Sequence, residues 1–205
     1  MWLATHGEGR RMRNLIIALL LVFPLPVFAD SIFSGDIAIS SDYVWRGYSQ
    51  NKNNPAISAG LNAEFKGLTL GVWASEVDFN DEAKYEYDII LDYSHNFNET
   101  FGISTGLIQY KWDKGYDDIN EAYVGINMKD LGVTYYKDLD NSNLDFANVV
   151  YTLTFIDVID ISLEYGKATG FDAYQALNIS KDLGIFTIGG QIGTEETSFG
   201  LNFGF

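Results

Sequence analysis

The chain has no cysteine, two histidines and three prolines among its 205 residues. Without cysteine it has no disulfide framework, no cysteine nucleophile and no cysteine-ligated metal site. Basic residues are scarce as well, with 13 Lys and Arg against 28 Asp and Glu. Such an acidic surface repels polyanions, so we expect no nucleic-acid partner. The sequence also offers no recognisable cofactor or metal motif, and we predict no cofactor.

Long apolar runs are missing, and the one apolar run that stands out lies near the start, at residues 14–23. It follows three arginines and precedes two prolines, and Val27 and Ala29 supply the small residues that a signal peptidase reads. The run is only about ten residues long, whereas a spanning helix needs about twenty. We therefore predict that residues 1–29 are a signal peptide and that cleavage before Asp30 releases residues 30–205 as one domain.

Cleavage would make the chain still more acidic. Removing residues 1–29 from the 205 takes away three of the 13 basic residues and one of the 28 acidic ones, which leaves 10 against 27. The remaining chain has no helical periodicity of useful length. Apolar and polar residues alternate instead, as at Tyr85, Tyr87, Ile89, Leu91 and Tyr93. A period of two residues predicts β-strands.

The alternation predicts twelve strands, at residues 34–48, 55–65, 68–76, 84–95, 101–112, 118–128, 131–138, 144–155, 159–167, 171–181, 185–194 and 197–205. The number is even, and the spacing suits tilted strands of about ten residues that cross a membrane. Tight connections such as Lys66-Gly67 alternate with longer polar ones such as residues 49–54. These features predict an all-β fold, a closed antiparallel up-and-down transmembrane β-barrel in the outer membrane of a Gram-negative bacterium.

A soluble β-sandwich would alternate in the same way, so the character of the two faces matters. The polar face carries Asp, Glu, Asn, Ser and many Gly, which is typical of a wet lumen rather than of a packed core. Closure of the barrel would satisfy every backbone group, as lipid requires. Tryptophans fall near the predicted outer strand ends, so we expect an aromatic girdle in the headgroup region that includes Trp45, Trp73 and Trp112.

Twelve strands lie between barrels that side chains just fill and wide porins, so we expect a narrow pore. Its predicted lining is acidic, and the candidates are Asp42, Arg46, Glu64, Glu86, Asp88, Asp92, Glu121, Asp160 and Glu164. For Arg46 there are two interpretations: it lines a pore, or it joins carboxylates across the lumen in a network that plugs and rigidifies the barrel. The sequence leaves both open. An acidic lumen predicts a preference for cations.

Two other functions are compatible with a barrel of this size. A hydrolase would need a histidine base with a serine and an orienting acid, and residues 30–205 contain only His95. We therefore predict no enzyme activity and no catalytic residue. A structural or adhesive barrel that does not conduct is the other alternative, although an adhesin usually projects longer outer loops than those predicted here.

The last strand carries the most specific motif. Phe199, Leu201, Phe203 and Phe205 form one apolar face, and the chain ends on phenylalanine. This pattern resembles the terminal strand by which outer-membrane barrels are recognised by the barrel assembly machinery. That machinery, outer-membrane lipid with lipopolysaccharide, and small-molecule solutes are the partners we expect.

The stretch Asp-Tyr-Val-Trp-Arg-Gly at residues 42–47 resembles the TorF family of porins, as do residues 71–79 and 85–88 more loosely. The resemblance spans nearly the whole chain after the leader. It implies a barrel with a role in passive transport, and it supplies no catalytic or binding residues.

Overall fold

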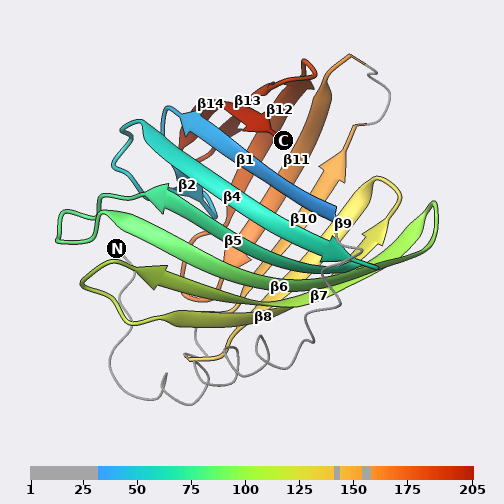
Figure 1. Ribbon diagram of the computed structural model, residues 1–205, viewed down its shortest axis with the longest axis horizontal. Coiled ribbons are helices and arrows are strands. Elements are labelled where there is room, and N and C mark those ends of the chain that lie inside the picture. Colours follow the sequence, from blue (N-terminus) through green and yellow to red (C-terminus); the bar gives the residue numbers. More distant parts are fainter. Residues whose placement is uncertain (1–31, 141–143, 154–157) are drawn as a thin grey trace.

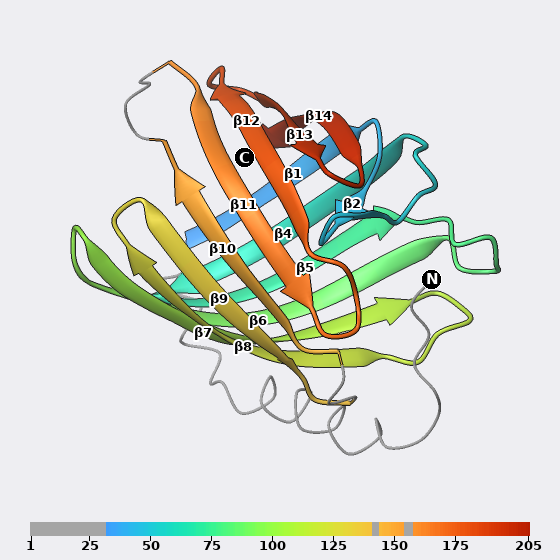
Figure 2. The same cartoon turned by 180° about the vertical axis from the view of Figure 1, so that it is seen from behind.

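Twelve antiparallel strands close into a barrel, as the sequence predicts (Figures 1 and 2). This computed structural model describes residues 32–140, 144–153 and 158–205, so the predicted signal peptide lies outside the described residues. The barrel strands are β1 (Ile32–Ser40), β4 (Ala56–Phe65), β5 (Leu68–Glu76), β6 (Tyr85–Asn98), β7 (Phe101–Trp112), β8 (Ile119–Met128), β9 (Leu131–Asp138), β10 (Phe146–Thr152), β11 (Asp160–Ala168), β12 (Tyr174–Asp182), β13 (Thr187–Gly193) and β14 (Thr197–Gly204). In the described ranges, no helix could span a membrane.

The barrel closes where its first and last strands meet. β1 pairs with β4 on one side and with β14 on the other, and every other barrel strand pairs with its neighbours along the chain. Gly35 and Phe205 extend the closing ladder, because each donates its N–H to the carbonyl of the other at 2.8 and 2.9 Å. No edge strand is left open, so each barrel strand has partners on both sides.

Three two-residue turns lie at one end of the barrel. Lys66 and Gly67 alone join β4 to β5, and both have positive φ (51° and 83°), which is the type I′ turn that suits a two-residue hairpin. The connections of β6 to β7 and of β8 to β9 are equally short. We call the end with these three turns the turn end and the opposite end the loop end.

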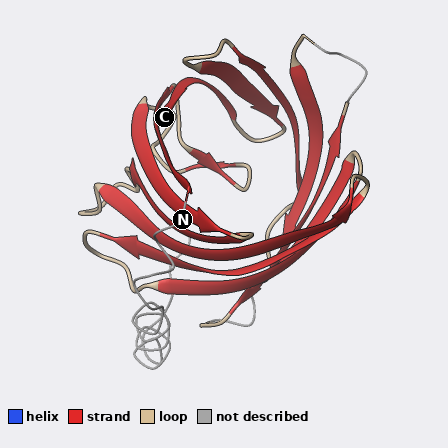
Figure 3. Ribbon diagram, turned by 45° about the vertical axis from the view of Figure 1, so that its right-hand side comes forward, coloured by secondary structure: helices blue, strands red, loops and turns tan. Residues whose placement is uncertain are grey.

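The first predicted strand, residues 34–48, is wrong in its second half. β1 ends at Ser40, and a separate two-stranded sheet follows, formed by β2 (Val44–Trp45) and β3 (Tyr48–Ser49). Arg46 and Gly47 between them have φ of 51° and 86°, so the chain reverses in a type I′ turn. We call residues 41–55 the inner hairpin, since it folds into the ring of barrel strands instead of extending the wall (Figure 3).

The outward face of the barrel is apolar. Exposed side chains at alternate positions include Leu61, Val124 and Phe199, which are 56%, 53% and 58% exposed. Gln109 and Asn120 are a buried polar pair at outward register positions near the loop end. Gln109 donates to Asn120 at 3.1 Å, and the side chain of Asn120 donates to Asp140 at 2.9 Å. The inward face holds a small cluster, Phe146, Ala168, Tyr174 and Ala176, against which Tyr136 and Phe171 pack.

The predicted girdle of Trp45, Trp73 and Trp112 is wrong in its direction. Trp73 and Trp112 lie near the loop end, but their register places them on the inward face. Trp73 packs edge-on against Tyr43 of the inner hairpin, and Trp112 donates a hydrogen bond to Glu86. Trp45 belongs to the hairpin itself and contacts Tyr110. The prediction rested on the position of these residues along their strands, which is near the membrane surface. The inner hairpin lies inside the barrel, where it gives Trp73 a partner in Tyr43.

Candidate functional site: the lumen and its outer pocket

The nine predicted lining residues fall into two groups. Strand register places seven of them on the inward face, and Asp42 and Arg46 belong to the inner hairpin. Arg46 therefore does not stand on a barrel strand, as the predicted strand 34–48 implied. The same register adds Asp36 and Asp138 to the inward acids, and the sequence reasoning missed both, although each occupies an alternate polar position in a predicted strand.

Arg46 connects the inner hairpin to the barrel wall. Its two terminal nitrogens donate to the two carboxylate oxygens of Glu121 on β8 at 2.8 and 2.6 Å. Its guanidinium also lies 4.2 Å from the ring centres of Trp45 and Phe146 and 4.9 Å from that of Tyr136. A planar guanidinium suits both a bidentate carboxylate and an aromatic face. The arrangement matches the network interpretation of Arg46.

Two other lumen carboxylates, Glu86 and Glu164, are held by neutral donors. Glu86 accepts from the Tyr43 hydroxyl at 3.2 Å and from the Trp112 indole at 3.1 Å. Glu164 accepts from Tyr174 at 2.6 Å and from Asn148 at 3.0 Å. Tyrosine hydroxyls and amides orient a carboxylate but do not cancel its charge. No Lys or Arg occupies an inward position on the described barrel strands, and the inner hairpin adds only Arg46 and, at the rim, Lys52, so the lumen keeps an excess of negative charge.

Three lysines that could have balanced the lumen point the other way. Lys111, Lys137 and Lys167 occupy outward register positions near the loop end. Lys111 pairs with Asp118 at 2.5 Å, and Lys137 pairs with Asp145 at 2.8 Å. Lys111 and Lys137 therefore form ion pairs at the rim of the barrel and do not neutralise carboxylates in the lumen.

Side-chain size divides the lumen into two halves. At the loop end the inward positions carry large rings and the inner hairpin, with Tyr110 donating to Glu121 at 3.0 Å. Toward the turn end the inward positions are mostly Gly, Ser, Thr and Asn, as at Gly71, Ser104 and Thr134. The narrow part of the lumen is therefore the part that the hairpin enters.

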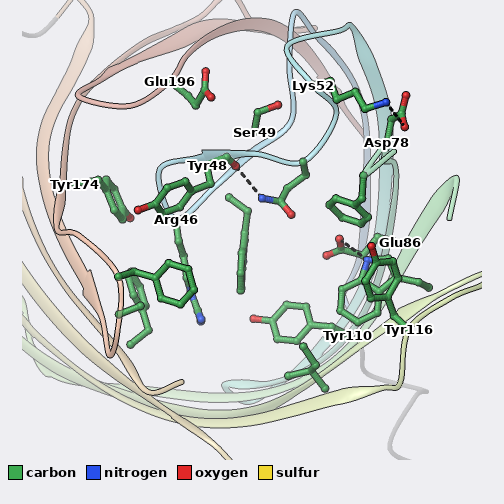
Figure 4. Close-up of a pocket in the computed structure, with 18 of the residues that line it drawn as sticks. Arg46, Tyr48, Ser49, Lys52, Asp78, Glu86, Tyr110, Tyr116, Tyr174 and Glu196 are labelled. Atoms are coloured by element: carbon green, nitrogen blue, oxygen red, sulfur yellow. Dashed lines mark hydrogen bonds and ion pairs between the residues drawn. The ribbon is translucent and has the colours of Figure 1, made fainter. Parts of the chain in front are cut away.

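A cavity of about 320 Å³ lies between the inner hairpin and the wall at the loop end (Figure 4). We call it the outer pocket. Figure 4 shows Tyr48, Tyr110 and Tyr174 around it, with Lys52 paired to Asp78 at its rim. The hydrogen bond from Lys52 lowers the pKa of Asp78, so this carboxylate is ionised at neutral pH.

The structure does not bring together a catalytic triad around His95. This residue lies at the turn end of β6 in an outward register position, and its ring packs edge-on against Phe97 at 4.7 Å. In the part of the chain that the structure describes, no three His, Asp or Glu side chains are grouped in a way that could hold a metal ion.

The predicted assembly motif lies on the outer surface. Phe199, Leu201 and Phe203 face outward from β14, and Phe205 follows directly after the strand. Phe205 is 75% exposed, although its ring lies beside Gly35, where an added Cβ would come within 2.7 Å of it.

Comparisons with known proteins agree with this architecture. A family model described as "Bacterial protein of unknown function (Gcw_chp)" matches residues 29–198. No curated protein matches the sequence significantly. The fold is similar to that of the KdgM porin in complex with disordered oligogalacturonate, with a TM-score of 0.62, 13% identity and coverage of 85% of this chain and 98% of that one. A second KdgM porin structure has a TM-score of 0.61 and 14% sequence identity, and the match covers 84% of this chain and 98% of that one.

Proposed function

The chain belongs to the Gcw_chp family, and from this premise and its barrel we propose that it is an outer-membrane porin-like channel that passes small solutes passively and prefers cations. The resemblance to TorF-family porins is part of the same proposal. A fold shared with the KdgM porin at 13% identity supports a barrel of this type and leaves the solute to be argued from this chain's own residues.

The membrane setting is supported by the two faces of the wall. Apolar side chains cover the outward positions, and closure satisfies the strand backbones, as a lipid environment requires. The predicted signal peptide would bring the chain to the periplasm, and the apolar face that ends at Phe205 would be read by the barrel assembly machinery. Lys111 and Lys137 at the outer rim lie where anionic headgroups of lipopolysaccharide would meet the barrel.

One observation carries the proposed selectivity: the described lumen holds about ten carboxylates and a single guanidinium, and neutral groups bond most of the acids whose partners are described. A narrow passage focuses the field of such fixed charges, so it attracts cations and repels anions. The solute of KdgM therefore does not transfer, because oligogalacturonate is itself an anion and would be repelled here.

A planar-bilayer recording tests the proposal. Residues 30–205 are refolded in detergent and added to a bilayer in KCl, and unitary current steps are expected. A barrel that folds, as judged by its heat-dependent migration on gels, but stays silent would contradict the channel.

A structural barrel without conduction is the second candidate, and the link between Arg46 and Glu121 favours it. In that case the inner hairpin is a permanent plug. Variants that release the hairpin separate the two candidates, because a plugged barrel would be silent until released, whereas a channel conducts from the start.

A further inference from the structure

The outer pocket combines aromatic walls with unpaired acids. Its rings come from three different parts of the chain: the inner hairpin, the wall strands and the outer loops. They include Trp45, Tyr48, Phe79, Trp112, Phe171 and Tyr174. Rings from separate elements that converge on one cavity form several faces toward which a flat ligand can stack.

The charged groups at the pocket are mostly acidic. Arg46 and Lys52 are its basic residues, and Glu121 and Asp78 already pair with them. Asp172 on the β11–β12 loop and Glu196 on the β13–β14 loop also line the pocket, and within the described residues neither carboxylate pairs with a cation. The pocket lining therefore carries negative charge that no described cation neutralises.

The pocket already holds one cation against its rings. The guanidinium of Arg46 lies 4.2 Å from the centres of both Trp45 and Phe146, which is the geometry of a cation–π contact. Tyr48 and Trp112 line the same cavity, and no described cation lies over either ring. Aromatic faces beside carboxylates are the surroundings that quaternary and protonated amines prefer in proteins.

We propose that the outer pocket binds organic cations with a flat apolar body, such as aromatic amines in protonated or quaternary form. Anions are repelled by Asp172 and Glu196, and a neutral ring would gain stacking alone. The cavity of about 320 Å³ is at the small end of the range for ligand sites, which suits one aromatic ring with its ammonium group. The inference rests on the proposed function for its setting, since the pocket faces the cell exterior only in an outer-membrane barrel.

Titration calorimetry on the refolded barrel in detergent tests the binding directly. Phenyltrimethylammonium is the probe, and benzenesulfonate and benzyl alcohol are the anionic and neutral comparisons. We expect the cation to bind at least about tenfold more tightly than either, because it gains both the cation–π and the carboxylate attraction. Equal affinity for the three compounds, or no binding of the cation, would overturn the inference.

Variants locate the site. The double change Asp172→Asn with Glu196→Gln should weaken the cation about three- to tenfold and leave benzyl alcohol unaffected. Phe171→Leu keeps an apolar side chain but removes a ring, so it should weaken the cation too. Glu99→Gln is the matched control, since Glu99 is exposed in the turn between β6 and β7, at the other end of the barrel from the pocket. Unchanged affinity in the double variant would place binding elsewhere and overturn the inference.

The outcome is independent of conduction. Cation binding by a barrel that never conducts would overturn the proposed channel and keep the pocket. Unitary currents from a barrel that does not bind phenyltrimethylammonium would support the proposed channel and overturn the pocket inference.

Discussion

Arg46 and Glu121, 75 positions apart in the sequence, form a bidentate ion pair between the tip of the inner hairpin and the barrel wall. Their side chains are only 9% and 2% exposed. A buried pair of this kind is costly to break from one side, because the remaining charge loses its partner inside the protein. The pair therefore fixes the hairpin in the lumen.

Replacing Arg46 by Gln should release the hairpin. Glu121 would remain buried without its cation, which costs about 3–5 kcal/mol in soluble proteins. We expect a larger and noisier single-channel current and a lower urea midpoint of unfolding.

Arg46→Lys is the informative companion variant. It keeps the charge but loses the two-pronged contact and the planar stacking. Its conductance should fall between those of the wild type and Arg46→Gln. Identical currents in all three proteins would show that the hairpin position does not depend on this pair.

Gly47 should be indispensable for seating the hairpin. Its φ is 86°, and an added Cβ would lie 2.6 Å from Cγ of Tyr174 on the wall. Gly47→Ala must therefore displace either the hairpin or the ring, and we expect it to raise the conductance as Arg46→Gln does.

Gly170→Ala is the matched control for Gly47→Ala. Gly170 has nearly the same φ, 81°, but nothing lies within 4 Å of its added Cβ. Backbone strain is similar in the two variants, so a difference between them reports the contact with Tyr174. Equal conductance in the two variants would mean that backbone strain alone, and not the contact with Tyr174, determines the effect of Gly47→Ala.

Gly47 marks the part of the first predicted strand that the sequence did not predict correctly. Alternation predicted twelve strands and the direction of all seven strand-borne acids, because a period of two fixes the face of each residue. Residues 42–48 were predicted to continue the first strand, but Arg46 and Gly47 turn the chain back on itself. A turn with an arginine at a positive φ has no strong sequence signal, since Asn-Gly or Asp-Gly normally marks it.

The inward direction of Trp73 and Trp112 was missed for another reason: they were placed by their position along the strand, and not by the alternation that puts them on the same face as Asp88 and Glu86. Trp73 and Trp112 contact Tyr43 and Glu86 inside the barrel. Partners that meet across a lumen depend on closure and on the inward fold of the hairpin, and neither can be read from local pattern. The pairing of Arg46 with one particular acid could not be predicted for that reason.

Phe205 should matter for assembly. Its backbone makes two hydrogen bonds with Gly35 beyond the last strand, so it lengthens the closing seam. Deleting Phe205, or changing it to Asp, is expected to reduce sharply the heat-modifiable band in outer-membrane fractions while the secreted amount stays the same. Gly204→Ala is the control, because its added Cβ meets nothing nearer than 3.9 Å. Normal assembly of both Phe205 variants would contradict this role.

The leader prediction has its own test. Mass spectrometry of the barrel isolated from outer membranes should give a chain that begins at Asp30. An intact precursor, or a mature protein found soluble in the periplasm, would contradict the proposed export and localisation.

Changing the lumen charge should change selectivity. Asp92, Asp160 and Glu164 face the lumen without a described cationic partner, so converting all three to amides should reduce the cation preference and leave the pair of Arg46 with Glu121 intact. Amides at three exposed acids outside the lumen, Glu82, Glu99 and Glu195, are the matched control and should have little effect.

The reversal potential of the unmodified barrel under a KCl gradient tests the central claim most directly. An acidic lumen predicts a cation-selective sign, strongest at low salt because the Debye length shrinks from about 30 Å at 0.01 M to about 10 Å at 0.1 M. A reversal potential of the opposite sign, which means anion selectivity, would contradict the account.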